Sequence, residues 1–341
     1  MKKGIIAVLT VSFLLAALFL LGAFNFTKPR ILVLQSSDRE SSTVKKMDEG
    51  IHRVLDKNRQ PISVRWHYLG IDGLPDEAHR LDAAKLGLRA IQQFDPDVVI
   101  AVDDEAQHYV MQRFAGRNRP RLVFAAIDHA PQAYGYVGAA NVTGIVEVLP
   151  LAAMAELLLQ ARQGQPARLA VLTDTGPTGA GQLKQVQAFN WAPHSLVAVH
   201  SSDDFSAWQN VVKAMDGKAD AVLVLSYNGL QTSPTVTAVV APTDIIRWLE
   251  RYSKPLPLGT GISYVEYGGG LSVAPSARSM GEVASANALQ WLKAKPGDQP
   301  PPITQSTHYS IAMRAGALRA RNLALPSIYV EAARIDQLYY P

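Results

Sequence analysis

Polar side chains that directly follow apolar runs are the residues of this 341-residue sequence best placed to do chemistry. Asp103 and Asp104, for example, come immediately after Val98–Val102. The full set is Ser36, Ser37, Asp103, Asp104 and Asp128 in the first half of the chain and Thr173, Thr175, Thr178, Ser226, Tyr227, Asn228 and Thr260 in the second. Each one alone fits an ordinary helix cap. As a set, they predict a binding site for a polar small molecule.

The apolar runs themselves indicate how these residues are positioned. Ile31–Leu34, Val98–Val102 and Leu122–Ile127 are short and continuously apolar, whereas Thr43–Leu55 repeats its apolar residues at helical spacing. Buried strands that alternate with helices are typical of parallel sheets covered on both faces. In such sheets ligands bind beyond the carboxyl ends of the strands, where helix N-termini converge. The sequence therefore predicts an α/β protein with its site at those ends.

Sequence signatures of catalysis, metal binding and nucleotide binding are missing. The chain has no cysteine, no HExxH pair among its eight histidines and no G-x-S-x-G elbow. The glycine-rich turn before Gly181 has Gln182 where a phosphate-binding loop needs lysine. We expect no enzyme activity, no cofactor and no metal. The alternative is an enzyme that uses Asp103 and Asp128 as facing carboxylates across a pocket.

Composition and charge narrow the choice of partners. Hydrophobic residues make up 48% of the chain and charged residues 18%, which is typical of a folded globular protein. The net charge is only +4, and no Lys/Arg cluster is interleaved with aromatic residues. Nucleic-acid binding is not expected.

The N-terminus predicts the compartment. Lys2 and Lys3 precede an uncharged run in which Ile5–Phe24 is almost entirely apolar. This run is long for a signal peptide and close to the length of a membrane-spanning helix. Lysines before the run and the folded portion after it predict a body outside the cytoplasmic membrane. Residues 1–29 are interpreted as a signal peptide or an N-terminal membrane anchor.

The stretch Arg121–Glu147 separates two series of alternating strands and helices. It breaks at Asp128 and resumes as a strand-like segment at Asn141. We predict a crossing between two lobes here, and a return to the first lobe through the helix Ala277–Lys295. Residues 30–130 plus 271–302 are assigned to the first lobe, and 140–270 plus 303–341 to the second. Ser327–Glu331 is predicted to be a final edge strand.

Several segments resemble a known family in order and spacing. These are Ile31–Ser37, Asp97–Asp103, Leu122–Ile127, Asn141–Ile145, which includes an NVTG segment, and Arg168–Thr173. Together they resemble the extracytoplasmic substrate-binding proteins of ABC transporters with a type I periplasmic-binding fold, in the branch related to tryptophan and tyrosine binders. Two departures are the absence of a lipid-modified cysteine and the acidic run Asp103–Glu105.

The resemblance implies two lobes, each a parallel sheet flanked by helices, joined by about three hinge crossings and closing on a small solute. It places Ser36, Ser37, Asp103, Ile127 and Asp128 on one face of the cleft. The residues from Thr173 to Thr260 in the set above form the other face. The implied partners are an amino-acid-like or other polar solute and an ABC transporter permease. The alternative is an anchored sensor that signals ligand occupancy to a membrane partner.

Overall fold

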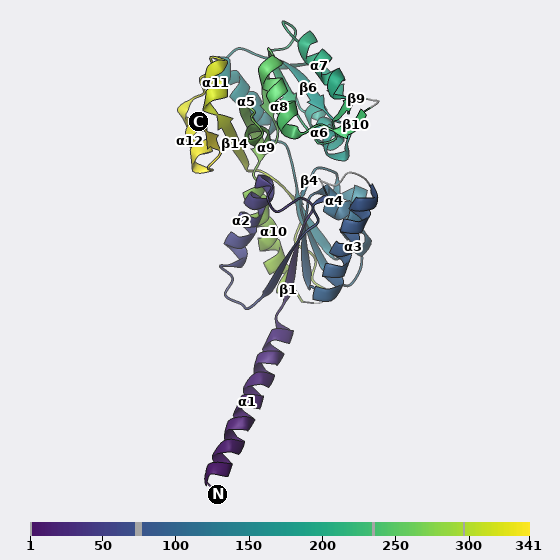
Figure 1. Ribbon diagram of the computed structural model, residues 1–341, viewed down its shortest axis with the longest axis vertical. Helices are drawn as coiled ribbons and strands as arrows, with labels where there is room; N and C mark the ends of the chain where they lie inside the picture. The colour runs from purple at the N-terminus through teal and green to yellow at the C-terminus, as the bar shows by residue number, and fades with distance from the viewer. Residues whose placement is uncertain (1, 72–76, 234–235, 296) are drawn as a thin grey trace.

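The computed structural model describes residues 2–71, 77–233, 236–295 and 297–341, which form two stacked lobes and an N-terminal helix (Figure 1). Helix α1, Lys2–Thr27, projects from the end of lobe 1 that lies farthest from lobe 2. Its apolar side chains, including Phe13 and Phe19, are exposed. Among the described residues, no helix has both the length and the apolar character that crossing a membrane requires.

Lobe 1 is built on a six-stranded sheet in the order β13-β5-β4-β3-β1-β2, and all of its pairs are parallel. The strands are β1 (Arg30–Gln35), β2 (Ser63–Tyr68), β3 (Val98–Val102), β4 (Arg121–Ile127), β5 (Val142–Val146) and β13 (Thr304–Gln305). Successive side chains of a strand point to opposite faces. Leu32 and Leu34 therefore enter one hydrophobic core, and Ile31 and Val33 enter the other. This is why the strand reads as a continuous apolar run.

Helices cover both faces of this sheet. α3 (Glu77–Phe94), α4 (Asp104–Ala106) and its continuations η2 (Gln107–Met111) and η3 (Gln112–Phe114) lie on one side (Figure 1). α2 (Ser42–Leu55) and the returning helix α10 (Ala277–Leu292) cover the other. Two glycines allow these helices to touch. A Cβ on Gly50 would lie 2.0 Å from the carbonyl oxygen of Arg278, and a Cβ on Gly281 would lie 2.4 Å from that of Met47.

Lobe 2 is built on a seven-stranded sheet in the order β15-β14-β12-β11-β8-β6-β7. Its strands are β6 (Arg168–Thr173), β7 (Ser195–Ser201), β8 (Ala221–Val224), β11 (Leu256–Gly259), β12 (Leu271–Pro275), β14 (Tyr309–Arg314) and β15 (Tyr339–Tyr340). The pairing of β12 with β14 is antiparallel. A separate two-stranded ribbon consists of β9 (Gln231–Ser233) and β10 (Val236–Val239).

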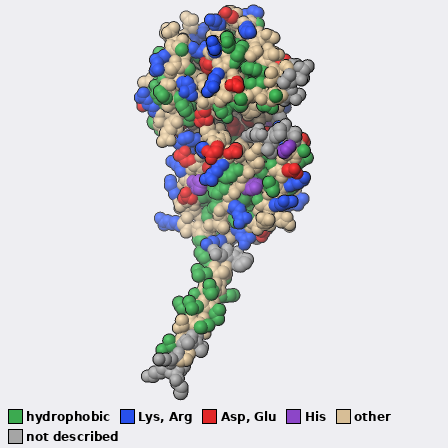
Figure 2. Space-filling model, viewed as in Figure 1, with side chains coloured by type: hydrophobic (Ala, Val, Ile, Leu, Met, Phe, Trp, Pro, Cys, Tyr) green, Lys and Arg blue, Asp and Glu red, His purple; other side chains and the backbone are tan. Residues whose placement is uncertain are grey.

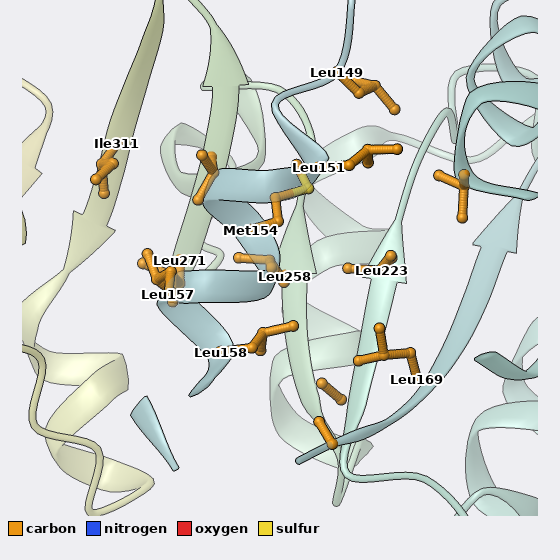
Figure 3. Close-up of a cluster of buried hydrophobic side chains, with 14 of the residues drawn as sticks. Leu149, Leu151, Met154, Leu157, Leu158, Leu169, Leu223, Leu258, Leu271 and Ile311 are labelled. Atoms are coloured by element: carbon orange, nitrogen blue, oxygen red, sulfur yellow. The ribbon is translucent and has the colours of Figure 1, made fainter. Parts of the chain in front are cut away.

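The helices of lobe 2 are α5 (Leu151–Ala161), α6 (Pro177–Ala188), α7 (Phe205–Ala214), α8 (Pro242–Tyr252), α9 (Ser263–Glu266), α11 (Ala315–Ala320) and α12 (Ser327–Ile335). Figure 3 shows α5 packed against one face of the sheet, where its Leu157 lies beside Leu271 of β12. Leu158 of α5 belongs to the same core as Leu169 and Leu223. Trp208 of α7 is fully buried in the core on the opposite face.

The predicted lobe boundaries need correction. The prediction starts lobe 2 at residue 140, but β5 pairs with β4 inside the lobe 1 sheet. It assigns residues 271–302 to lobe 1, but β12 belongs to the lobe 2 sheet and only α10 returns to lobe 1. It assigns everything after 303 to lobe 2, but β13 pairs with β5. The chain thus changes sheets at residues 147–150, at Ser276 and at residues 306–308.

The C-terminal prediction is also wrong. Residues 327–331, predicted to be an edge strand, form the first part of α12. Alternation of Ile328 and Val330 suggests a strand over so short a run, but the following Ala332 and Ala333 favour helix. Ala333 is fully buried against the lobe 2 core, and this packing fixes the helix.

Candidate functional site

The segments that join the lobes are hydrogen-bonded to one another. The amide of Ser306 donates to the carbonyl of Val146 at 2.9 Å, and its hydroxyl accepts from the amide of Val148 at 2.8 Å. The amide of Ser276 donates to the carbonyl of His308 at 2.9 Å. The parallel strands of lobe 1 run toward lobe 2, so their carboxyl ends face it (Figure 1). The candidate site is therefore the cleft between the lobes.

On the lobe 1 face, Ser36 and Asp103 meet as predicted from their positions after β1 and β3. The hydroxyl of Ser36 donates to Oδ2 of Asp103 at 3.0 Å, and the hydroxyl of Ser37 lies 3.5 Å from that of Ser36. Oδ1 of Asp103 accepts from the amide of Asp104 at 2.7 Å. Asp103 has a φ of 73°, an uncommon conformation for a residue other than glycine. Local hydrogen bonds at both carboxylate oxygens hold it there.

Asp104 organises the loop that follows β4. The residue is only 3% exposed, and its carboxylate accepts from the amide of Asp128 at 2.9 Å and from the hydroxyl of Tyr134. Nδ1 of His129 lies 3.4 Å from the same carboxylate, and this contact raises the pKa of His129. The geometry therefore gives no support to the prediction that Asp104 contacts a ligand, because both carboxylate oxygens already accept hydrogen bonds from the protein.

Ile127 and Asp128 end β4 with different roles. The side chain of Ile127 is fully buried in the lobe 1 core, so only its backbone is available to the cleft. Asp128 faces lobe 2: its carbonyl oxygen would lie 3.3 Å from a Cβ on Gly181 of α6. Its Oδ1 is buried and has no hydrogen-bond partner among the described residues. Asp128 is the predicted site residue with the clearest unmet bonding capacity.

On the lobe 2 face, Asp174 is the organising residue. It is 2% exposed and accepts from the hydroxyl of Ser226 at 2.8 Å, the amide of Gly229 at 3.0 Å and the amide of Gly176 at 3.2 Å. The carboxylate thus ties the loop after β8 to the N-terminus of α6. A buried carboxylate with several donors is a stable arrangement.

The other predicted residues of lobe 2 lie in varied environments. Thr175 donates from its amide to Asp203 at 2.7 Å and also from its hydroxyl. Tyr227 is buried in the core and does not present its ring to the cleft. Thr173 and Thr260 are buried, Thr178 is half-buried and Asn228 is exposed. The structure therefore groups Ser226 and Thr175 around α6, while Tyr227 acts as packing.

Two residues missing from the predicted set lie at the centre of the junction. Gln182 of α6 accepts from the hydroxyl of Thr260 at 3.5 Å and reaches across to the carboxyl of Asp128. Glu147 is the first residue after β5 and lines a cavity of about 60 Å³ together with Thr260 and Ser276. Gln182 lies within a helix, where the strand-end rule does not apply, whereas Glu147 directly follows β5 and was omitted from the predicted set. The sequence signal for Glu147 is that it ends the run NVTGIVE, residues 141–147.

Electrostatics distinguish this junction from the rest of the cleft. Burial, followed by the charges of Glu147 and Asp104, raises the pKa of Asp128 well above its ordinary value. Burial, with a smaller contribution from Asp104, raises the pKa of Glu147 to about 7. Carboxyl groups so placed hold protons near neutral pH. Asp103 is not among the main influences on Asp128, so the alternative of facing Asp103 and Asp128 carboxylates gains no support.

A second set of polar contacts bridges the lobes beside the cavity. The hydroxyl of Ser42 donates to Glu266, and Nζ of Lys46 donates to the carbonyl of Asp336 at 3.2 Å. The guanidinium of Arg278 lies 3.5 Å from the carboxylate of Asp336. Acidic and basic side chains are visible along the junction in Figure 2. No group of three His, Cys, Asp or Glu side chains in the described ranges is arranged to hold a metal ion.

No protein-family model matches the chain, and no curated protein matches its sequence. Solved structures do match. The ABC domain in complex with L-Trp from Streptococcus pneumoniae has a TM-score of 0.64 at 17% identity, over 90% of this chain and 98% of that one. CD0873, a substrate binding protein with adhesive properties from Clostridium difficile, has a TM-score of 0.62 at 15% identity, over 88% and 96%.

A myo-inositol binding protein from Caulobacter, bound to myo-inositol, matches with a TM-score of 0.55 at 14% identity, over 91% of this chain and 99% of that one. These similarities cover both lobes and their crossings. The chain has the two-lobed type I periplasmic-binding-protein fold, as the sequence resemblance predicts. At such low identity the similarity establishes the fold alone.

Proposed function

We propose that this protein is an extracytoplasmic solute-binding protein that captures a small organic solute between its lobes and delivers it to an ABC transporter. The observation that carries the proposal is the cleft itself. Polar residues at the ends of β1, β3 and β4 oppose the N-terminus of α6, and the segments joining the lobes are adjacent and hydrogen-bonded. The ligands named for proteins of similar fold, L-Trp and myo-inositol, agree with a small solute.

Binding in this cleft requires the lobes to separate. The cavity at the junction is about 60 Å³, whereas pockets for small organic ligands are on the order of 300–1,000 Å³. The contact between Asp128 and Gly181 also brings the two faces together. Hinge closure about a few crossing segments is a common way to enclose a ligand. We expect solute to bind an open form and to favour the closed one.

The experiment is a search for the solute on the full chain. Native mass spectrometry of freshly purified protein tests for a co-purified small molecule. Thermal unfolding in the presence of amino acids, sugars and organic acids tests for stabilisation, because a ligand that binds only the folded state raises the melting temperature. A specific shift supports the proposal. The absence of both a co-purified molecule and any shift counts against it.

An anchored sensor is the second candidate, because the long apolar segment of α1 precedes the lobes. In this alternative the same cleft reports occupancy to a membrane partner. Intact-mass measurement of the exported protein discriminates between the two. Loss of the N-terminal segment favours a free transport receptor, and retention favours an anchored one.

A further inference from the structure

The amino ends of the lobe 1 strands lie at the end of the molecule opposite the cleft. These strands begin level with one another, since Arg30 of β1 pairs with Ser63 of β2. Val98 of β3 likewise pairs with Arg121 of β4. The amide of Asp97 donates to the carbonyl of Arg30 at 2.9 Å, and the amide of Arg121 donates to the carbonyl of Asp97 at 3.0 Å. The segments that precede the strands therefore form one continuous surface.

This surface, which we call the base, is basic. It consists of residues 28–30, 56–63, 95–97, 115–121, 293–295 and 297–303. Nine of these residues are Lys or Arg and four are Asp, a net charge of +5, whereas the whole chain carries only +4. The positive charge of the protein is thus concentrated at this end, and the remainder is slightly acidic. Lys and Arg side chains are visible around the point where α1 leaves lobe 1 (Figure 2).

The cations of the base fall into two groups. Some stabilise the fold: Arg119 pairs with Asp97 at 2.8 Å, and Arg121 donates to the carbonyls of Trp291 and Ala294. Others are exposed and form no ion pair with any residue that the structure describes, and these are Lys57, Arg59, Lys293 and Lys295. Like charges so gathered repel one another and do not stabilise the fold. An external anion can therefore bind them without breaking a contact within lobe 1.

An apolar helix adjoins the base. Only Lys28 and Pro29 separate the end of α1 from β1. The side chains of Phe13 and Phe19 on α1 are 71% and 75% exposed, and Nζ of Lys28 lies 4.7 Å from the ring centroid of Phe24. Large exposed apolar surfaces mark sites of contact with a protein or a membrane. A partner that covers this end must therefore offer anions directly beside an apolar phase.

We propose that the base is a docking surface for a membrane that contains anionic phospholipid. Phosphate headgroups supply the negative charge, and the acyl chains beneath them cover apolar side chains of α1. Nucleic acid or an acidic protein surface matches the charge but offers no apolar phase beside it. Docking places lobe 1 against the membrane and leaves lobe 2 pointing away from it (Figure 1). The docking surface is separate from the cleft, so it does not depend on which solute binds there.

A fluorescent label tests whether the base touches the membrane. The chain has no cysteine, so one introduced cysteine takes one label. Asn118→Cys labels the exposed base, and Asn210→Cys labels an exposed position on α7 of lobe 2 as the reference. The full chain is mixed with vesicles of phosphatidylcholine, with or without phosphatidylglycerol, that carry a quencher on their headgroups. We expect at least twofold greater quenching of the Asn118→Cys label on the anionic vesicles and no such difference for the reference. The difference should vanish at about 1 M salt, where the Debye length is about 3 Å.

A charge-reversal variant tests the four unpaired cations. It combines Lys57→Glu, Arg59→Glu, Lys293→Glu and Lys295→Glu, and it is expected to lose the additional quenching. The matched control reverses the same number of exposed charges on lobe 2, with Lys213→Glu, Lys218→Glu, Lys254→Glu and Arg319→Glu, and it is expected to keep the additional quenching. Circular dichroism checks that both variants fold.

The lipid and salt comparisons need none of these charge reversals, so they decide the matter even where a variant does not fold. Equal quenching on the two kinds of vesicle overturns the docking surface. Equal loss of quenching in the two variants overturns it too, because net charge alone would then explain the effect. Tighter binding to duplex DNA than to anionic vesicles at the same salt concentration assigns the base to nucleic acid and also overturns it.

Discussion

The two faces of the cleft each contain a buried aspartate that holds a loop, but the charged groups around the two aspartates differ. Each has one nearly fully buried aspartate that fixes a strand-end loop, Asp104 in lobe 1 and Asp174 in lobe 2. Asp174 receives its hydrogen bonds from neutral hydroxyl and amide groups. Asp104 also accepts from amide and hydroxyl groups, but it pairs with the imidazole of His129 as well and lies near the carboxyls of Asp128 and Glu147. The polar groups of the lobe 2 face satisfy one another, whereas the lobe 1 face gathers carboxyl groups whose charged forms burial disfavours.

This difference indicates which face determines the ligand. A face whose polar groups satisfy one another holds its shape and contributes hydroxyls and a helix N-terminus. A face with several buried carboxyl groups responds to the charge of what binds there, because a nearby cation favours their charged forms and a nearby anion disfavours them. We therefore propose that lobe 2 provides a preorganised face of the cleft, and that the end of β4 and the first crossing determine which solute binds.

The largest expected effect comes from removing the two organising aspartates. Asp174→Ala is expected to lower the free energy of unfolding by about 3 kcal/mol, because three donors lose a buried charged acceptor. Asp104→Ala is expected to cost only about 1–2 kcal/mol, because the lost hydrogen bonds are partly offset by removal of a like charge beside Asp128 and Glu147. Urea unfolding at pH 7 measures both. Equal losses in the free energy of unfolding would show that the two faces do not differ in this respect. Asp82→Ala, at an exposed position, is the control.

The pH dependence of stability tests the acidic junction directly. Glu147 has a folded-state pKa of about 7 and an ordinary value of 4.5, so the folded state binds more protons between these values. Stability therefore falls as pH rises from 5 to 8, by at most about 3 kcal/mol from this group. The raised pKa of His129 acts in the same direction, since its ion pair is lost as the imidazole deprotonates.

Melting temperatures across this range measure the effect. Glu147→Gln is expected to flatten the curve, because the neutral amide does not titrate. The carboxylates with lowered pKa values, such as Asp220, contribute their change below about pH 4 and leave this window unaffected. An unchanged slope in the variant would show that Glu147 is well solvated.

Contact between the faces is tested at Gly181. A Cβ there would lie 3.3 Å from the carbonyl oxygen of Asp128, so Gly181→Leu is expected to hold the lobes apart without disturbing either core. Small-angle X-ray scattering should show a larger radius of gyration, and ligand affinity should fall at least tenfold, about 1.4 kcal/mol. Ala180→Leu, at the exposed neighbouring position, is the control. Unchanged dimensions would mean that the contact does not limit closure.

The smallest expected effect concerns the junction between the crossings. The Ser306 hydroxyl bonds the backbone of Val148, so Ser306→Ala is expected to cost about 1 kcal/mol. Thermal unfolding measures the loss, with Ser195→Ala on the exposed edge strand as the control. A loss no greater than in the control would indicate that the crossings are held by their backbone bonds alone.

Strand-end reasoning predicted part of the candidate site, and did not identify Gln182 and Glu147 at the junction between the lobes. It identified Ser36, Asp103 and Asp128, because β1, β3 and β4 are continuous apolar runs and their ends are visible in the sequence. It also included Tyr227, and the family resemblance added Ile127, but the structure buries both side chains in the hydrophobic cores of the two lobes. It missed Asp174 as an organiser, because burial and hydrogen-bond partners follow from loops far apart in the chain.

The sequence by itself determined the α/β class, the parallel strands and the polar strand ends, since these depend on local hydrophobic patterns. Tertiary structure decided which sheet each strand joins, because strands can pair whatever their separation and order along the chain. β5 and β12 consequently lie in the lobes opposite to those predicted. Only the folded structure brings Asp128, Glu147 and Gln182 together from a strand end, a crossing and a helix, because their proximity depends on the packing of one lobe against the other.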